Sequence, residues 1–250
     1  KKIKFEVIND ENNLTNEDIL IIVDSSVEKK IKLYTKLRLV CSKIFLIHLG
    51  DEASFYNLSS IYNNCDFVWR TFCSGKYFNN DKVMCLPIGY KSGVCSTKNG
   101  GNRKYKWAFM GTPHKSSRQD LLFQLSNVKP SFSHKTKKFD QDILEVNNMN
   151  EILSLTTFIP CPNGFVHPET YRLYEALQCD CIPIVEDSYK YYDRLFPGNP
   201  FIKVEKWLDA KLIIENWDQQ KILNKRKECS DWWKNYKESL QEIFFKKIKS

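Results

Sequence analysis

The stretch CPNGFVHPETYRLYEALQCDCIPIV, residues 161–185, decides the fold class of this 250-residue chain. Its pattern predicts a strand that ends at Cys161, a loop with a glycine, a helix over Pro168–Gln178 and a second strand over Ile182–Glu186. Pro168 suits the first position of that helix, because its ring fixes φ and its missing N–H would have no partner there. A strand, a helix and another strand in this order are typical of a parallel sheet covered by helices.

The same alternation runs through both halves of the chain and predicts two α/β lobes. In the first half we expect strands Ile3–Ile8, Ile19–Val23, Ile44–Leu49, Phe67–Arg70 and Val83–Pro87, with helices Glu28–Leu39 and Ala53–Tyr62. The polar, double-glycine segment Ser96–Asn102 reads as a linker, after which the pattern restarts. There we expect strands Lys106–Met110, Ser131–His134, Phe158–Cys161, Ile182–Glu186 and Phe201–Val204, with helices Ser116–Leu125, Pro168–Gln178 and Ser188–Phe196. Residues 206–249 look helical almost throughout. We therefore predict an N-terminal lobe over residues 1–98, a second lobe over 104–228 and a C-terminal helix over 229–250 that packs back on them.

The composition indicates a globular protein with an anionic partner. Hydrophobic residues make up 42% of the chain, and no apolar run approaches the ~20 residues that a membrane span needs. The formal charge of +8 favours an anionic ligand, although a lysine-rich surface can also serve solubility alone. The densest basic cluster is short, and no basic segment with interleaved aromatics is present, so we do not expect nucleic-acid binding. That cluster consists of Lys135, Lys137 and Lys138.

The first candidate site is the loop and helix of the opening stretch. A helix N-terminus after a loop with Asn163 and Gly164 presents free backbone N–H groups to an anion. Arg172 and Glu175 are three residues apart on one helix face, where Arg172 can pair with phosphate and Glu175 can accept hydrogen bonds from ribose hydroxyls. An ordinary surface Arg–Glu pair is the competing interpretation.

Two other strand ends carry candidate residues. The strand over Lys106–Met110 leads to Gly111, whose backbone can approach a ligand closely, and Lys115 and Arg118 follow with positive charge. In the first lobe, Asp51 and Glu52 follow a predicted strand. Either carboxylate could act as a general base there, or it could cap the next helix.

Taken together, these segments resemble the exostosin-like glycosyltransferases (family 47), in particular small algal and large-virus members. The matching segments run in the family's order: His48–Glu52, Leu86–Gly93, Phe109–Gly111 with Arg118, and Arg172–Val185. The last is the most specific. One departure is Asp180, where many relatives carry glycine, and the chain is also short for this family.

The resemblance implies a GT-B fold of two Rossmann-like lobes facing a cleft, and an inverting transfer from a nucleoside-diphosphate sugar to a hydroxyl of a glycan acceptor. UDP-xylose is our first expectation for the donor, since xylosyltransferases are among similar proteins. The family pattern places Glu175 on the ribose, and Arg172 and Arg118 near the diphosphate. We expect Asp51, or failing it Glu52, to be the base, and we expect no essential metal or other cofactor.

Three alternatives remain open. The chain could be a catalytically silent partner of the same fold that binds nucleotide or glycan. It could be a GT-A enzyme that uses Asp140 and Asp142 as a metal-binding Asp-x-Asp pair, or, least favoured, a nucleic-acid-binding protein.

The nine cysteines are scattered without a Cys-x-x-Cys pair, so we expect reduced, buried thiols and a cytoplasmic location. An anchor upstream of Lys1 would instead place the chain in the Golgi lumen.

Overall fold

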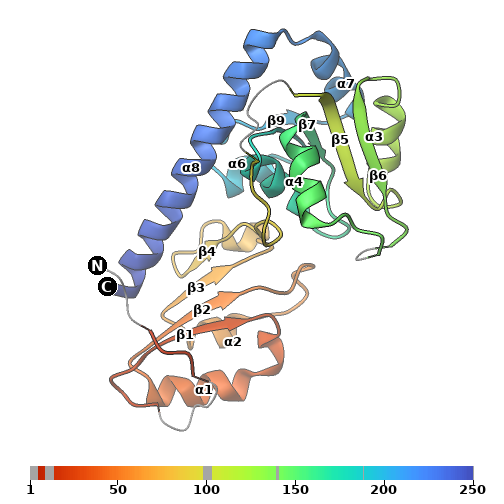
Figure 1. The fold of residues 1–250 in the computed structure, drawn as a ribbon. Coiled ribbons are helices and arrows are strands. Elements are labelled where there is room, and N and C mark those ends of the chain that lie inside the picture. Colours follow the sequence, from red (N-terminus) through yellow and green to blue (C-terminus); the bar gives the residue numbers. More distant parts are fainter. Residues whose placement is uncertain (1–4, 9–13, 98–102, 139–140, 188, 250) are drawn as a thin grey trace. The chain divides into compact units, whose positions relative to one another are not determined.

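The chain divides into two compact units, Lys1–Leu86 and Pro87–Ser250 (Figure 1). The computed structural model describes residues 5–8, 14–97, 103–138, 141–187 and 189–249. The predicted linker lies outside these residues from Lys98 on, and so does Asp140 of the alternative metal site.

Unit 1 is built on a four-stranded parallel sheet in the order β1-β2-β3-β4. The strands are β1 (Ile19–Asp24), β2 (Lys43–His48), β3 (Phe67–Arg70) and β4 (Val83–Cys85), and the helices are η1 (Val27–Lys29), α1 (Ile31–Val40), α2 (Ser59–Tyr62) and η2 (Gly75–Tyr77). Tyr34 and Leu37 of α1 are buried in a core that also contains Ile44, Leu46 and Val68 of the sheet. Because all four strands are parallel, their carboxyl ends meet at one edge.

Two predicted elements of this unit are wrong. Phe5–Ile8 is not a strand, and Ile3 lies outside the described residues. The helix expected from Ala53 shortens to Ser59–Tyr62, because Asp51 and Ser54 adopt left-handed backbone conformations with φ of 60° and 53°. The residues between β2 and α2 therefore form a loop at the carboxyl edge of the sheet.

Cys73 and Cys85 form a disulfide across twelve residues of sequence, which corrects the expectation that all the cysteines are reduced. The other seven cysteines are free, and all but Cys95 are buried. Disulfides persist mainly in oxidising compartments, so this bond argues against the predicted cytoplasmic location.

Unit 2 contains a five-stranded parallel sheet in the order β6-β5-β7-β8-β9. Its strands are β5 (Tyr105–Gly111), β6 (Ser131–Lys135), β7 (Thr156–Cys161), β8 (Ile182–Glu186) and β9 (Ile202–Val204). Its helices are α3 (Arg118–Gln124), α4 (Val146–Ser154), α5 (Tyr171–Gln178), α6 (Tyr191–Leu195), α7 (Trp207–Asn216) and α8 (Gln219–Lys249). The strand order reverses between β5 and β7. In open α/β sheets, ligands bind beyond the carboxyl ends of the strands at such a reversal.

The two sheets confirm the predicted α/β class with two parallel-stranded lobes, and unit 2 also shows where the sequence prediction fails. The sequence did not predict α4, which contains three of the weak helix former Asn. Pro168 is not the first residue of α5. That helix begins at Tyr171 after an extended Thr170, because the preceding residues fold into a loop with its own hydrogen bonds.

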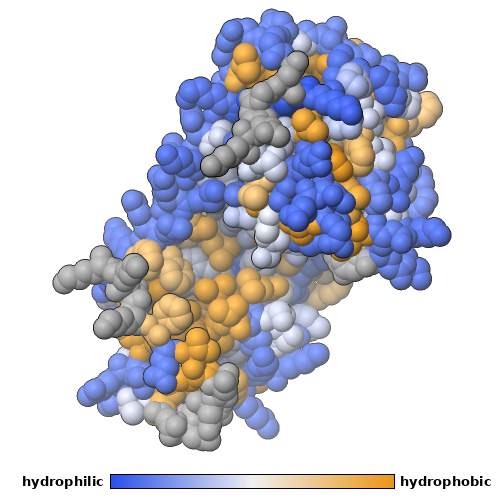
Figure 2. Space-filling model, viewed as in Figure 1, coloured by the Kyte–Doolittle hydropathy of each residue, from blue (hydrophilic) through white to orange (hydrophobic). Residues whose placement is uncertain are grey.

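Helix α8 begins ten residues before the predicted position 229 and packs against α5 and β8 within unit 2. The Trp233 indole and the Lys237 amine both donate to the Gln178 side chain, and the Ser230 hydroxyl donates to Asp180 at 2.7 Å. Asp180 has φ of 56°, the conformation in which glycine is usual, and its bond to α8 helps to hold it there. Hydrophilic side chains cover α8 on the face shown in Figure 2, and no described helix combines the length and apolarity needed to cross a bilayer.

Candidate functional site

Arg172 lies in the first turn of α5 and reaches back over the end of β5. Its Nε donates to the Met110 carbonyl at 3.0 Å, and its guanidinium lies 4.9 Å from the centroid of the Phe109 ring. A side chain at Gly111 would displace the guanidinium, since a Cβ there would lie 2.2 Å from Nη2 of Arg172. Gly111 therefore serves by giving room to the guanidinium, and its φ of 135° also favours glycine.

Arg118 supplies a second guanidinium at the same edge of the sheet. It begins α3, is 7% exposed, and donates from Nη1 to the Thr112 carbonyl at 3.0 Å. Burial, and then the charge of Arg172, lower the pKa of Arg118 to about 10. In the part of the chain that the structure describes, neither arginine forms an ion pair with a carboxylate. Two buried like charges of this kind are stabilised by a bound anion.

Glu175 lies one turn further along α5. Burial raises the pKa of its carboxyl, an effect that the charges of Arg172 and Lys91 and a hydrogen bond from the Lys91 backbone N–H oppose. This bond and the bond from the Ile88 N–H to Glu169 hold the backbone at Ile88 and Lys91 against α5 and the loop before it. Glu175 is partly exposed, so its free carboxylate lone pairs can accept further hydrogen bonds.

The loops after β5 and β7 are tied together through Glu186 at the end of β8. Its carboxylate accepts a 2.6 Å bond from Ser117 and a 3.4 Å bond from the Asn163 N–H. The Asn163 side-chain oxygen is buried without a hydrogen-bond partner in the described structure. Gly164 is required by the tight path of its loop, since a Cβ there would lie 2.4 Å from the His167 carbonyl oxygen.

Lys115 extends from the loop after β5, and its amine lies 5.5 Å from the ring centroid of Phe165 in the loop after β7. Phe165 is 75% exposed. The structure thus brings together, at the β5/β7 end of one sheet, all the residues that the sequence predicts for the nucleotide sugar: Gly111, Lys115, Arg118, Asn163, Gly164, Arg172 and Glu175.

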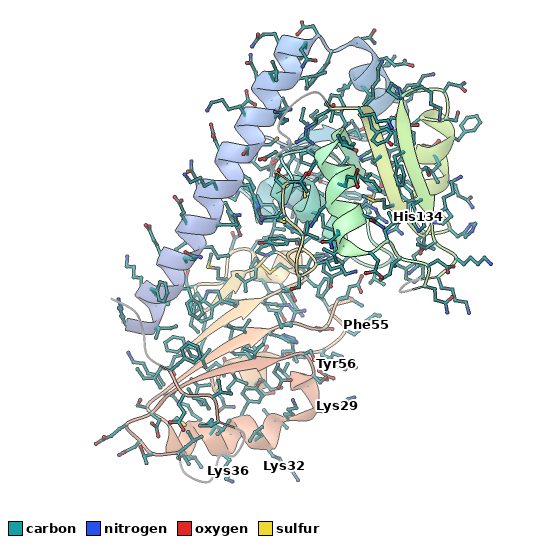
Figure 3. The ribbon with its side chains drawn as sticks, in the orientation of Figure 1. Lys29, Lys32, Lys36, Phe55, Tyr56 and His134 are labelled. Carbon is teal, nitrogen blue, oxygen red and sulfur yellow. A yellow bond between two sulfur atoms is a disulfide. The ribbon has the colours of Figure 1, made fainter. Side chains whose placement is uncertain are left out.

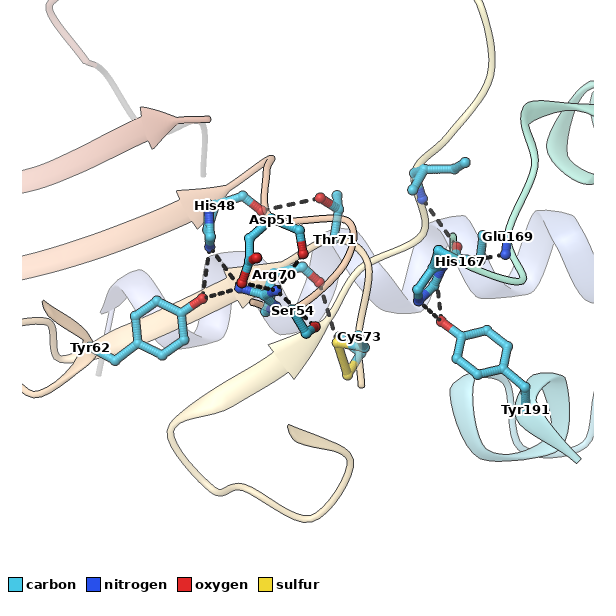
Figure 4. Close-up of a disulfide and its surroundings, with 12 residues drawn as sticks. His48, Asp51, Ser54, Tyr62, Arg70, Thr71, Cys73, His167, Glu169 and Tyr191 are labelled. Carbon is cyan, nitrogen blue, oxygen red and sulfur yellow. Dashed lines mark hydrogen bonds and ion pairs between the residues drawn. A yellow bond between two sulfur atoms is a disulfide. The ribbon is translucent and has the colours of Figure 1, made fainter. Parts of the chain in front are cut away.

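The sequence missed a buried network around Glu169. This carboxylate is 3% exposed and accepts hydrogen bonds from the hydroxyls of Tyr174 and Tyr191 and from the Ile88 N–H. His167 lies beside it and contacts Tyr191 at 3.1 Å (Figure 4). Glu169 therefore lies in the loop before α5, although the predicted helix Pro168–Gln178 includes it. It anchors the loop after β7 to the residues that begin unit 2.

In unit 1, the Asp51 carboxylate is buried in an ion pair and is not exposed to solvent. Its Oδ2 lies 3.0 Å from Nη2 of Arg70, and the two side chains are 1% and 0% exposed. Arg70 also donates to Tyr62 at 2.8 Å and contacts Nδ1 of His48 at 3.0 Å (Figure 4). Burial, and then the charge of Arg70, lower the pKa of His48 to about 4, so this histidine is neutral near pH 7. Glu52, in contrast, is exposed.

No group of three or more His, Cys, Asp or Glu side chains that could hold a metal is found among the described residues. Because Asp140 is not among them, turnover without a metal stays a prediction.

Asp51→Asn should lower the free energy of unfolding by roughly 3 kcal/mol, because it leaves Arg70 buried without its counter-charge. Urea unfolding followed by circular dichroism measures this loss. The exposed neighbour provides the control, and Glu52→Gln should change stability by less than about 0.5 kcal/mol. Equal, small effects of the two variants would contradict a structural role for Asp51.

The Glu169 carboxyl should make stability depend on pH. Burial raises its pKa from 4.5 to about 7, so the folded protein holds this proton more tightly than the unfolded chain does. The resulting stabilisation is complete below pH 4.5 and is lost as the pH rises through 7. Between pH 5 and 8 the wild type should therefore lose roughly 3 kcal/mol more than Glu169→Gln. If the free energy of unfolding changed equally with pH in the two proteins, Glu169 would be ionised over the whole range from pH 5 to 8.

Comparison with known proteins identifies the family. Residues 91–250 match the family model described as the RXYLT1 C-terminal domain. Ribitol-5-phosphate xylosyltransferase 1 of Danio rerio is 24% identical over 234 residues, which cover 81% of this chain and 54% of that protein. The proteins of the same name from Mus musculus and Homo sapiens are 29% and 26% identical and cover 59% and 57% of this chain.

The chain spans about half the length of the Danio rerio relative and 38% and 37% of the other two. Its resemblance to exostosin-like glycosyltransferases is confirmed, and the chain belongs to the family of the RXYLT1 C-terminal domain, whose relatives named here are xylosyltransferases.

Proposed function

We propose that this chain transfers xylose from UDP-xylose to a hydroxyl of a phosphate-bearing acceptor, with inversion at the anomeric carbon. The observation that carries the proposal is the pair Arg118 and Arg172 at the strand-order reversal of unit 2, whose guanidiniums form no ion pair with any carboxylate that the structure describes. The names of the relatives supply the sugar and suggest the acceptor, ribitol 5-phosphate or a glycan that contains it.

In this proposal the donor lies across the carboxyl ends of β5 and β7. Arg118 and Arg172 bind the diphosphate, and Glu175 accepts hydrogen bonds from the ribose hydroxyls. Gly111 leaves room for the Arg172 guanidinium in this arrangement. The buried Asn163 side-chain oxygen, which has no partner among the described residues, can accept a bond from a donor hydroxyl.

The transfer is a single displacement at the anomeric carbon. The acceptor oxygen forms the new bond to that carbon while the bond from the carbon to the UDP oxygen breaks. The acceptor proton passes to a carboxylate, and the charge left on UDP is stabilised by Arg118 and Arg172. Because these side chains already match the diphosphate charge, we propose that no divalent metal is needed.

The sequence predicts two candidate bases in unit 1, and the exposed carboxylate is the better candidate. The Asp51 carboxylate is occupied by Arg70, whereas Glu52 next to it is exposed and free to accept a proton. We therefore propose Glu52 as the base and Asp51 as the residue that fixes its loop.

The Cys73–Cys85 disulfide supports a location in an oxidising compartment, such as the lumen of the secretory pathway. The Golgi lumen, the alternative considered from the sequence, satisfies this condition.

The donor site predicts that Arg172→Met weakens UDP binding by at least about tenfold, because a hydrogen bond to a charged group contributes about 1.5–3 kcal/mol. Titration calorimetry with UDP measures the change. Arg194→Met, a variant of an exposed arginine of α6, is the matched control and should bind as the wild type does. Unchanged UDP affinity in folded Arg172→Met would place the donor elsewhere.

Transfer itself separates an enzyme from a silent binding partner. Purified protein with UDP-xylose and ribitol 5-phosphate should release UDP and form a xylosylated product, and an excess of EDTA should not abolish this. Glu52→Gln should retain UDP affinity while turnover falls by about 10²–10⁴. UDP binding without any transfer or donor hydrolysis would favour the silent partner, and loss of activity on chelation that Mn²⁺ restores would favour the Asp140–Asp142 alternative.

A further inference from the structure

One basic cluster is not used by the donor site. Lys135 is the last residue of β6, and Lys137 and Lys138 follow after Thr136. All three are exposed, and none of them forms an ion pair with a described carboxylate. His134, which is labelled in Figure 3, marks this end of the strand.

The cluster belongs to the same sheet edge as the donor arginines. In the β5–β6 pairing, Lys135 lies opposite Gly111, the residue over which Arg172 passes. Thr136 is 5% exposed and is fixed to β5 twice, by a 3.2 Å bond from its N–H to the Gly111 carbonyl and by a 3.0 Å contact with the Thr112 hydroxyl. The Thr112 carbonyl in turn accepts the bond from Arg118. The lysines on either side of Thr136 are therefore presented from anchored backbone.

The charges at this edge exceed what the donor requires. A nucleoside diphosphate sugar carries two negative charges on its diphosphate, and Arg118 and Arg172 supply two positive ones. Glu186 accepts hydrogen bonds from Ser117 and Asn163, and Glu175 accepts one from the Lys91 backbone N–H. Both carboxylates keep their negative charge, and the three lysines exceed it. The three exposed lysines repel one another, and a second anionic group that binds beside the donor diphosphate relieves that repulsion.

We propose that Lys135, Lys137 and Lys138 bind the phosphate of the acceptor, next to the donor diphosphate. This inference rests on the proposed function and extends it by assigning the group that recognises a phosphorylated acceptor. The lysines act as exposed point charges, so the interaction selects acceptors by charge and weakens with salt.

A binding experiment separates the donor from the acceptor. The affinities of UDP, ribitol 5-phosphate and ribitol are measured by calorimetry or ligand-observed NMR for the wild type and for Lys135→Ala/Lys137→Ala/Lys138→Ala. The triple variant should bind ribitol 5-phosphate about tenfold more weakly, since three modest exposed ion pairs are lost, and it should bind UDP within about threefold of the wild type. High salt should weaken ribitol 5-phosphate binding in the wild type more than in the variant.

Two control variants each remove three positive charges at other positions of the chain. Lys234→Ala/Lys246→Ala/Lys249→Ala acts on exposed positions of α8, and Lys29→Ala/Lys32→Ala/Lys36→Ala acts on the exposed lysines of unit 1 labelled in Figure 3. Both should bind ribitol 5-phosphate as the wild type does. An equal loss in either of them, or an unchanged affinity in the variant at 135, 137 and 138, would overturn the proposal.

The outcomes also distinguish this inference from the proposed function. A wild type that binds UDP but not ribitol 5-phosphate would refute the phosphate site alone. A wild type that does not bind UDP would refute the donor site. A tenfold loss of UDP affinity in the variant at 135, 137 and 138 would assign these lysines to the donor diphosphate instead.

Discussion

The site in unit 2 depends on the path of one guanidinium. Arg172 starts from the first turn of α5, passes over the backbone of Gly111, and is held by the Met110 carbonyl and the Phe109 ring. This contact joins α5 to the end of β5 and brings a positive charge to the strand-order reversal. Its partners are backbone and an aromatic face, so the charge of the arginine is left for a ligand.

The surrounding structure stabilises the position of Arg172 without neutralising its charge. At the other end of α5, the Arg103 guanidinium donates to the carbonyls of Cys179 and Asp180, so a cation satisfies carbonyl groups where the helix ends. The same guanidinium donates to the carbonyls of Leu153 and Thr156, around the end of α4. Ser230, Trp233 and Lys237 of α8 bind the same turn. The loop before α5 is anchored by the buried Glu169. Helix α5 is therefore fixed at both ends, which preorganises Arg172 and Glu175 for a ligand.

Some elements of the fold could be predicted from the sequence, and others could not. Strands β2, β3, β5 and β8 were predicted within one residue at each end, since each is an apolar run between polar turns. Helix α5 (Tyr171–Gln178) lies within the predicted helix, but the predicted start at Pro168 was wrong, because a buried hydrogen-bond network at Glu169 outweighed the local preference of proline. No local pattern marks Glu169 as buried, since its partners Ile88 and Tyr191 are distant in sequence.

The candidate residues of unit 2 were found because they follow strand ends, and parallel strands bring their carboxyl ends to one edge. The ion pair of Asp51 with Arg70 could not be predicted in the same way. An acidic residue after a strand fits a base, a cap or a buried partner equally well, and only the position of Arg70 on the neighbouring strand separates these. The disulfide was missed for a related reason, because Cys73 and Cys85 have no motif spacing and meet only through the β3–β4 pairing.

The central claim is that a nucleotide sugar binds at the carboxyl ends of β5 and β7. Hydrogen–deuterium exchange with and without saturating UDP-xylose tests it most directly, because a ligand that binds the folded state slows the opening of the segments that it contacts. The account predicts slower exchange in residues 109–118 and 162–178, with α8 beyond Trp233 unchanged. UDP-xylose binding that leaves both segments unprotected, or that protects only other parts of the chain, would contradict it.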